Sequence, residues 1–264
     1  MTENIATIRL TGVGIGYRTR HGVRTVASGI SATLLSGELT CLLGRNGAGK
    51  STLLRTLAGF QPPLGGSIVI CGRPLEDFSS GELSQQLGVV LTERPDVQQT
   101  TVWDMVAMGR SPYTGFWGRL RHSDREQVWQ AIRQTGIEPL AERQMSTLSD
   151  GERQKVMIAK ALAQQTGIII LDEPTAFLDY PSKVETLLLL RRISHQQGKT
   201  IFLSTHDLEL ALQVADRLWL MDSSNRLVIG TPRELADQRV LSRYVEQSAG
   251  ISFDSQSMSI RVVT

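Results

Sequence analysis

The sequence reads Gly44-Arg45-Asn46-Gly47-Ala48-Gly49-Lys50-Ser51 between the apolar run 39–43 and the helix-like segment 52–58. The order of strand, glycine-rich turn and helix matches the phosphate-loop pattern G-x-x-x-x-G-K-[ST]. Glycines let successive backbone N–H groups surround a phosphate, and the positive end of the following helix faces the same anion. We therefore expect Lys50 to contact the β- and γ-phosphates of a nucleotide and Ser51 to bind Mg²⁺.

The composition indicates one globular chain with a sizeable core. Of the 264 residues, 41% are hydrophobic, and the 28 basic and 26 acidic residues are mixed, so no charge block indicates a nucleic-acid surface. No apolar run reaches the roughly 20 residues that span a bilayer, and residues 1–4 do not begin a secretory signal, which predicts a cytoplasmic protein. Cys41 and Cys71 lie in strand-like segments without metal-binding spacing, so we expect buried thiols.

The residues before the phosphate loop predict an antiparallel β arm. Residues 5–43 contain short β-like segments, with turns expected at Gly12, Gly14 and Gly16. Tyr17 is the only aromatic residue in this part of the chain, and we expect it to stack on an adenine ring. Packing against the protein itself is the alternative.

After the phosphate loop, strand-like and helix-like segments alternate, which predicts a parallel α/β sheet. Between residues 92 and 165 the pattern changes to helices, at 102–109, 123–136 and 153–165, which predicts an inserted helical subdomain. Its middle, 109–117, combines turn formers with three aromatic residues and is a candidate contact surface. Aromatic residues buried in a loop are the alternative.

Two further strands end in polar residues. The run 168–171 is apolar throughout, as in a strand buried on both faces, and ends at Asp172 and Glu173. Carboxylates at this end of a strand lie at the ligand-binding crevice, so we expect Asp172 to reach Mg²⁺ and Glu173 a water beside the γ-phosphate. The strand 201–205 ends at His206, and its place at the same sheet edge favours a phosphate role.

With these motifs in hand, the stretch Leu148-Ser149-Asp150-Gly151-Glu152-Arg153-Gln154 resembles the LSGGQ signature of ABC-transporter ATPases. Residues 175–179 resemble the family's loop after the acid pair, and 204–207 its histidine switch. The resemblance covers nearly the whole chain. Residues 106–113 and 208–212 look most like ATPase subunits of importers for iron-siderophore, haem or vitamin B12 complexes.

The resemblance implies an α/β P-loop NTPase fold with a central, mostly parallel sheet, an N-terminal antiparallel β arm and an inserted helical subdomain. It implies one ABC ATPase domain, 1–264. Within it we expect a nucleotide-binding core at 5–91 and 166–247, a helical subdomain at 92–165 and a C-terminal tail at 248–264.

The resemblance also implies the site residues, with ATP and Mg²⁺ as cofactors. Catalytic roles fall to Glu173, His206 and Glu93, and metal ligation falls to Ser51, Asp172 and Glu93. ATP contacts fall to Tyr17, Gly44, Arg45, Asn46, Gly47, Ala48, Gly49, Lys50, Ser51, Thr52, Ser149, Gly151 and Asp179.

Three residues depart from the family pattern. Asp150 replaces a signature glycine, and we expect its side chain to point away from the γ-phosphate. Glu152 replaces the signature glutamine. Glu93 stands where the family usually has a glutamine, and we expect it to link the γ-phosphate site to the helical subdomain; Gln98 and Gln99 are the alternative residues for this role.

The resemblance implies an ATPase at the cytoplasmic face of the inner membrane. The chain would form a head-to-tail homodimer with ATP between the copies, bind membrane permease subunits, serve a substrate-binding protein indirectly and bind no nucleic acid. Docking candidates are Arg110, Tyr113, Phe116 and Trp117. Another substrate, export, or a soluble non-transport ATPase of this family remain alternatives. The absence of a long coiled-coil insertion, of a second cassette and of a guanine-type N-K-x-D motif disfavours DNA-repair, translation-associated and GTPase readings.

Overall fold

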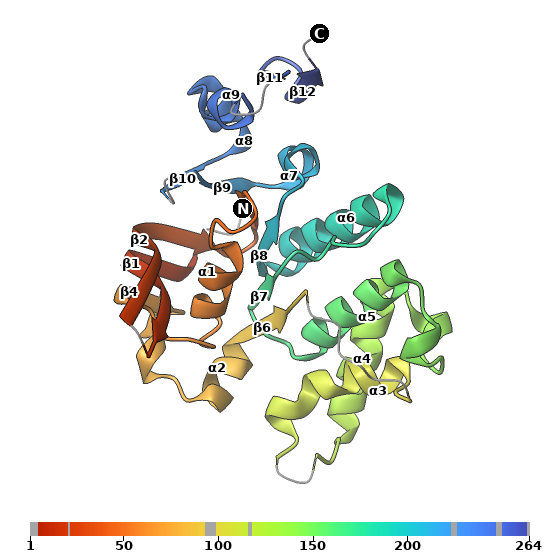
Figure 1. Cartoon of the computed structure of the whole chain (residues 1–264). Helices are drawn as coiled ribbons and strands as arrows, with labels where there is room; N and C mark the ends of the chain where they lie inside the picture. Colours follow the sequence, from red (N-terminus) through yellow and green to blue (C-terminus); the bar gives the residue numbers. More distant parts are fainter. Residues whose placement is uncertain are drawn as a thin grey trace.

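The computed structural model describes residues 5–20, 22–92, 99–115, 118–222, 226–246 and 250–262 (Figure 1). Its strands are β1 (Ala6–Thr19), β2 (Gly22–Leu35), β3 (Leu39–Gly44), β4 (Gly65–Ile70), β5 (Arg73–Pro74), β6 (Leu87–Val90), β7 (Ile168–Leu171), β8 (Thr200–Thr205), β9 (Arg217–Met221), β10 (Leu227–Gly230), β11 (Ile251–Asp254) and β12 (Ser259–Val262). Its α-helices are α1 (Lys50–Leu57), α2 (Ser80–Gln86), α3 (Val102–Ala107), α4 (His122–Thr135), α5 (Asp150–Ala163), α6 (Tyr180–Gln197), α7 (Leu208–Val214), α8 (Pro232–Asp237) and α9 (Val240–Val245). Short 3-10 helices are η1 (Leu75–Asp77), η2 (Met108–Tyr113), η3 (Glu138–Leu140) and η4 (Met145–Thr147).

The central sheet brings distant parts of the sequence to one edge. Its strands lie in the order β10-β9-β3-β8-β7-β6, and neighbouring strands are parallel except for β10 and β9. Parallel strands end at the same edge of a sheet, so the residues that follow β3, β7 and β8 lie close together. This topology confirms the predicted α/β fold with a mostly parallel central sheet.

Both faces of this sheet are buried. In β7, Ile169 and Leu171 pack into the core on the side of the helices α5 and α6, whereas Ile168 and Ile170 pack into the core on the side of the β arm. A strand that is covered on both faces needs apolar residues at every position, not at every second one. The continuous apolar run in the sequence therefore has a direct structural cause.

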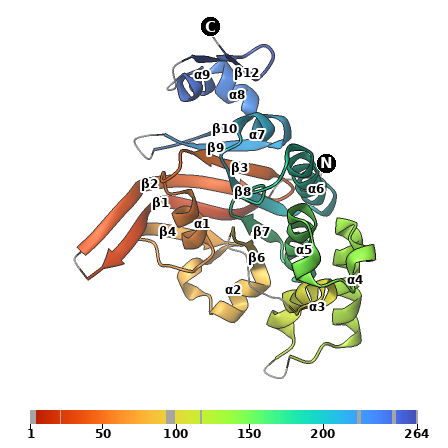
Figure 2. The same ribbon diagram turned by 45° about the vertical axis from the view of Figure 1, so that its right-hand side comes forward.

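The β arm is a second sheet with the order β2-β1-β4-β5, and β1 and β2 project from it as a hairpin (Figure 2). Each of these two strands has 14 residues, so the short segments and glycine turns predicted here are wrong. The glycines instead lie at or near irregularities, because the pairing register shifts between Leu10 and Val13 and between Ile15 and Gly16. Gly16 has no room for a side chain, since a Cβ there would lie 2.1 Å from the carbonyl oxygen of Arg24.

The two cysteines differ in their surroundings. Cys41 is buried in β3, and this burial, with a further contribution from the charge of Asp216, raises the pKa of its thiol. Cys71 follows the last residue of β4 and is exposed, so the prediction of a buried thiol is wrong for this residue. Its positive φ of 49° turns the chain out of the strand directly after Ile70.

Helices α3, α4 and α5 pack against one another on the side of the molecule away from the β arm (Figures 1 and 2). The predicted helix 102–109 ends earlier, at Ala107, and continues as η2. Gly109 allows η2 to lie directly against α5, because a Cβ there would lie 2.2 Å from the carbonyl oxygen of Lys160. Among the described residues, no helix has both the length and the apolar composition needed to cross a membrane.

The C-terminal part begins with a capping box at the start of α8. The hydroxyl oxygen of Thr231 accepts a hydrogen bond from the Glu234 N–H, and Pro232 occupies the first position of α8. After α9 the chain forms the hairpin β11–β12, in a segment that was predicted only as a tail. Phe253 of this hairpin packs into the same core as Leu241 of α9.

Candidate functional site

The phosphate loop joins β3 to α1, as predicted. Gly47 and Gly49 have φ angles of 83° and 101°, which other residues rarely adopt. A Cβ on Gly49 would also lie 2.4 Å from Cγ1 of Val26, whereas nothing lies within 4 Å of the corresponding position on Gly47. Glycine at position 49 therefore serves both the backbone turn and the close approach of β2.

Lys50 places a positive charge at the base of this loop. The residue is only 5% exposed, and its Nζ donates a hydrogen bond of 2.8 Å to the carbonyl oxygen of Gly44. The same Nζ lies 3.5 Å from Oε1 of Glu173. A buried ammonium requires such acceptors, and they hold it beside the glycine-rich turn.

Asp172 is fixed by hydrogen bonds from two neighbouring elements. Its Oδ1 accepts one from the hydroxyl of Ser51, at 3.1 Å, and one from the hydroxyl of Ser204, at 2.6 Å. The Thr92 hydroxyl donates to the backbone carbonyl oxygen of Asp172 at 2.7 Å. The structure thus brings Ser51 and Asp172 together, as expected for two ligands of one metal ion.

Glu173 lies between a lysine and a histidine. Its Oε2 is 3.1 Å from Nδ1 of His206, while Oε1 faces Lys50. The backbone of Glu173 has a φ of 46°, an uncommon value for this residue type, and its N–H donates to the hydroxyl oxygen of Ser204 at 2.9 Å. This backbone bond helps to hold the unusual conformation and thereby orients the carboxylate.

Ser204 is a site residue whose contacts were not predicted. Its hydroxyl donates to Asp172 and accepts from the backbone of Glu173, and the residue is completely buried. The contacts of Ser204 could have been predicted from its place near the end of β8, because β8 is the parallel neighbour of β7.

An open cavity of about 430 Å³ lies over the phosphate loop. Its lining residues are Tyr17, Arg24, Val26, Asn46, Gly47, Gly49, Lys50, Ser51, Thr52 and Glu173. Of the predicted ATP contacts, Gly44, Arg45 and Ala48 are not among the lining residues. The sequence analysis missed Arg24 and Val26, which reach the cavity from β2.

Tyr17, which was expected to stack on an adenine ring, borders the cavity and also makes a contact with the protein. The residue is 42% exposed, and its hydroxyl lies 2.7 Å from Oγ1 of Thr52 in α1. The exposed part of the ring leaves a surface on which a base could stack.

These residues fit a magnesium nucleotide. The glycine-rich turn leaves open space at Gly47, and the buried ammonium of Lys50 provides the charge that a phosphate needs. The Ser51 hydroxyl and the Asp172 carboxylate are hard oxygen ligands, of which Mg²⁺ takes few from a protein.

The signature helix α5 begins at Asp150, earlier than the predicted Arg153, because Ser149 caps it. The hydroxyl of Ser149 accepts a hydrogen bond from the Glu152 N–H, and the Glu152 carboxylate accepts from the N–H of Ser149 at 2.8 Å. The hydrogen bond from the Ser149 backbone lowers the pKa of Glu152. Glu152 therefore completes a capping box, which the spacing S-x-x-E could have revealed.

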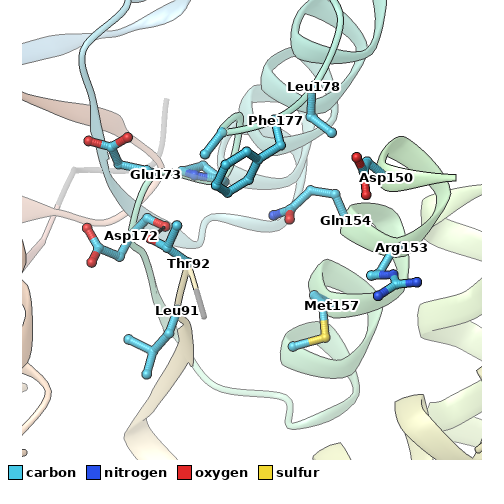
Figure 3. A pocket seen from close by; sticks show the side chains of 12 residues that line it. Leu91, Thr92, Asp150, Arg153, Gln154, Met157, Asp172, Glu173, Phe177 and Leu178 are labelled. Carbon is cyan, nitrogen blue, oxygen red and sulfur yellow. Dashed lines mark hydrogen bonds between the residues drawn. The ribbon is translucent and has the colours of Figure 1, made fainter. Parts of the chain in front are cut away.

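A second cavity separates α5 from the loop after β7 (Figure 3). Asp150 and Gln154 line it from α5, whereas Glu173 and Phe177 line it from the other side. Phe177 is 72% exposed and has a φ of 65°.

Three further predicted ATP contacts, outside the phosphate loop, do not line this cavity either. Ser149 and Gly151 lie at the start of α5, where a Cβ on Gly151 would be 3.0 Å from the hydroxyl of Ser182. Asp179 caps α6 by accepting a hydrogen bond from the Ser182 N–H, and hydrogen bonds from Ser182 lower the pKa of the Asp179 carboxyl.

Arg110 is not an exposed docking residue, which corrects the prediction. It is only 6% exposed, and its guanidinium lies 2.9 Å from Oδ1 of Asp124 in α4. It also donates to the carbonyl oxygen of Ala163 and stacks at 4.1 Å on the ring of Tyr113. Arg110 therefore joins η2, α4 and α5 inside the helical part.

Of the other docking candidates, the structure describes Tyr113 alone. Tyr113 is 36% exposed, and its hydroxyl donates to the carbonyl oxygen of Gln164 at 3.0 Å. Phe116 and Trp117 lie outside the described residues, as does Glu93, to which the sequence assigned a catalytic and metal-binding role.

The cavity, the buried lysine and the carboxylates at one sheet edge define a P-loop nucleotide hydrolase. Lys50, the glycine-rich turn and Glu173 line one cavity. The chain belongs to the ABC transporter family, whose family model matches residues 27–176. It is an ATP-binding and ATP-hydrolysing cassette of that family.

Individual relatives cover most of the chain. It is 38% identical to an uncharacterized ABC transporter ATP-binding protein of Methanocaldococcus jannaschii, over 89% of this chain and 80% of that protein. It is 35% identical to the ferric enterobactin transport ATP-binding protein FepC of Escherichia coli, over 92% and 88%. The solved structure of CbiO1 from Clostridium perfringens, part of the ABC transporter complex CbiONQ, is 28% identical with a TM-score of 0.78, over 92% and 96%.

Proposed function

We propose that the chain binds ATP with Mg²⁺ over the phosphate loop. Lys50 neutralises the β- and γ-phosphates, Ser51 and Asp172 hold the metal ion, and Tyr17 stacks on the adenine. The remaining predicted ATP contacts in the loop surround the phosphates with their backbone. The metal ion supplies charge neutralisation on the phosphates when it is bound.

Glu173 acts as the general base on the attacking water. Its carboxylate is oriented on one side by His206, whose Nδ1 is 3.1 Å away, and on the other by Lys50. His206 holds the γ-phosphate side of the site, and Glu93 links that site to the helical subdomain. The observation that supports ATP hydrolysis at this site is the pair of Lys50 and Glu173, because an acid and a phosphate-binding cation line one cavity.

Cassettes of this family dimerise, and two ATP molecules bind between the copies in a head-to-tail arrangement. Ser149, Gly151 and Asp179 then serve the nucleotide of the partner copy. None of these three residues lines the cavity over the phosphate loop of its own chain, which supports this arrangement. Hydrolysis removes the anion that joins the copies, which makes the interface a switch.

The transport system is an importer for ferric siderophores, haem or vitamin B12, with the siderophore class favoured by the relative FepC. The chain acts at the cytoplasmic face of the inner membrane, bound to permease subunits that receive cargo from a substrate-binding protein. We retain the division into a core at 5–91 and 166–247, a helical subdomain at 92–165 and a tail at 248–264. Tyr113, Phe116 and Trp117 remain docking candidates.

Uptake by cells tests the transport assignment. Cells whose only copy is Lys50→Ala should lose uptake of a labelled ferric siderophore, while Lys155→Ala, a change at a lysine paired with Glu185, should keep it. Labelled haem and vitamin B12 are tested in the same cells. Normal uptake of all three compounds by Lys50→Ala cells would contradict the proposal.

Mixed dimers test the shared site. With Lys50→Ala on one chain and Ser149→Arg on the other, one site carries both defects and the second stays intact. With both changes on one chain, each site carries one defect. We expect ATP hydrolysis to survive in part only in the first mixture. Activity that survives only in the second mixture, in which one chain is unchanged, would show that each chain works alone.

A further inference from the structure

Arg24 reaches the cavity over the phosphate loop from the β arm. It lies directly opposite Tyr17 in the pairing of β1 with β2, and both residues line that cavity. Among the described residues, no carboxylate pairs with the Arg24 side chain. Residues 5–37 contain four arginines and no aspartate or glutamate, so the arm is a basic surface.

The start of the signature helix has the opposite charge. Asp150 is the first residue of α5, and Glu152 completes the capping box on Ser149. The hydrogen bond from the Ser149 backbone lowers the pKa of Glu152, so its carboxylate stays ionised at neutral pH. Arg143 of the same chain lies 3.6 Å from Glu152, so this end of the helix carries two carboxylates beside one paired guanidinium.

These charges pose a problem in a head-to-tail dimer. The signature of one copy would approach the phosphates that the other copy holds, and two carboxylates would face an anion. Helix N-termini favour anions, but added carboxylates at the same end work against the approach of a second one. A cation from the nucleotide-binding copy near the rim of the site would reduce this repulsion.

Arg24 is the available cation. Of the lining residues of the cavity, Arg24 and Lys50 are basic, and Lys50 is already held by the Gly44 carbonyl oxygen and Glu173. A guanidinium stays charged at all relevant pH values and binds carboxylates with two parallel hydrogen bonds.

We propose that Arg24 pairs with the acidic signature start of a second copy of this chain, Asp150 and Glu152, when ATP closes the dimer. The inference rests on the proposed head-to-tail dimer and adds a charge contact that fixes how the two copies meet. It also explains how an acidic signature is tolerated beside a nucleotide.

Sedimentation of the Glu173→Gln chain with ATP and Mg²⁺ measures this contact, because blocked turnover lets the dimer accumulate. At low salt, adding Arg24→Glu should raise the dimer dissociation constant by roughly tenfold, since it places like charges together. The effect should shrink at about 0.5 M NaCl, where screening is strong. Arg18→Glu, on the same hairpin but outside the cavity lining, is the matched control and should have little effect.

A neutral signature provides the decisive comparison. Asp150→Asn with Glu152→Gln removes both charges and keeps a residue that can complete the capping box. In this background Arg24→Glu should change the dissociation constant by less than about threefold. ATP binding by the monomer, measured with a fluorescent ATP analogue, is the reference, and Arg24→Glu should weaken it by a smaller factor than it weakens the dimer.

Three outcomes separate the possibilities. If Arg24→Glu weakens dimers equally in both backgrounds, or weakens monomer ATP binding by the same factor, Arg24 contacts the nucleotide and the inference is overturned. If it has no effect on a dimer that does form, the inference is likewise overturned. If the Glu173→Gln chain forms no dimer with ATP, the proposed dimer itself fails.

Discussion

The hydroxyl of Ser204 donates a 2.6 Å hydrogen bond to the Asp172 carboxylate. It also accepts a hydrogen bond from the backbone N–H of Glu173, the residue that follows Asp172. One buried side chain on β8 therefore positions both acids at the end of β7. The proposed metal ligand and the proposed general base share this support, so disturbing it should affect both.

Ser204→Ala should lower Mg²⁺-dependent turnover by about 10- to 100-fold, the usual effect of removing a group that orients a metal ligand. It should also reduce the free energy of unfolding by about 1.5–3 kcal/mol, because the lost bond is to a carboxylate. Steady-state ATPase assays over a range of Mg²⁺ concentrations test the first effect. Ser194→Ala, at a buried serine whose hydroxyl donates to the Arg191 carbonyl oxygen of its own helix, is the control. Equal turnover in both variants would remove Ser204 from this role.

Glu173→Gln should keep ATP binding and reduce hydrolysis by roughly 10²- to 10⁴-fold, the range that a general base contributes. The amide preserves the size of the side chain but cannot accept a proton from water. Glu209→Gln, at an exposed acid in α7, should hydrolyse ATP normally. Single-turnover measurements separate chemistry from product release. Near-normal turnover by purified Glu173→Gln would assign the base to another residue.

Arg110→Ala should destabilise the protein by roughly 3–5 kcal/mol, because it leaves the Asp124 carboxylate buried without its partner. Urea unfolding measures this loss. Arg133→Ala, at an exposed arginine in the last turn of α4, should change the free energy of unfolding little. If the two variants were equally stable, the buried pair would contribute nothing.

The same pair predicts a pH dependence. Burial alone would raise the pKa of Asp124, but hydrogen bonds from the Arg121 N–H and from Arg110 outweigh it and hold the pKa below the usual value. The stabilisation is thus fully present above the unfolded-state pKa of about 3.9, and it is lost as the pH falls through the folded-state pKa. The stability difference between the wild type and Asp124→Asn should therefore shrink below about pH 4. A difference that stays constant to lower pH would contradict this assignment.

The contact of Tyr17 with Thr52 and its proposed stacking on adenine can be tested separately. Tyr17→Phe removes the contact with Thr52 but keeps the ring, and should change ATP affinity by no more than about threefold. Tyr17→Ala removes the stacking surface and should weaken binding by about 1–3 kcal/mol. Phe60→Ala removes an exposed aromatic residue outside the cavity lining and is the control for nucleotide titrations. Equal losses in the Phe and Ala variants would argue against stacking.

The sequence was sufficient for features that depend on local patterns. A continuous apolar run predicted that β7 is buried on both faces, and the residues after it were placed correctly at the edge of the sheet. The phosphate loop was recognised because its glycines and Lys50 follow one another directly. Such signals need no knowledge of which strands are neighbours.

Contacts between side chains on neighbouring strands or helices could not be predicted from local sequence patterns. Ser204 reaches Asp172 only because β8 pairs with β7, and Arg24 enters the cavity only through its register with Tyr17. Arg110 was predicted to lie on a contact surface because its segment combines turn formers with aromatic residues. Its burial depends on Asp124, which lies on another helix, and on that helix packing against η2.

The contrast between the two cysteines has a practical consequence. The chain has two thiols, of which Cys41 is sealed in the central sheet and Cys71 stands exposed at the end of β4. A maleimide dye should therefore label the native protein at Cys71 alone, without engineered cysteines. Partial burial raises the pKa of this thiol, so the reaction should proceed faster under mildly alkaline conditions, where more thiolate is present. The label would sit on the sheet that carries Tyr17 and Arg24, and its fluorescence could follow the β arm during each ATP cycle.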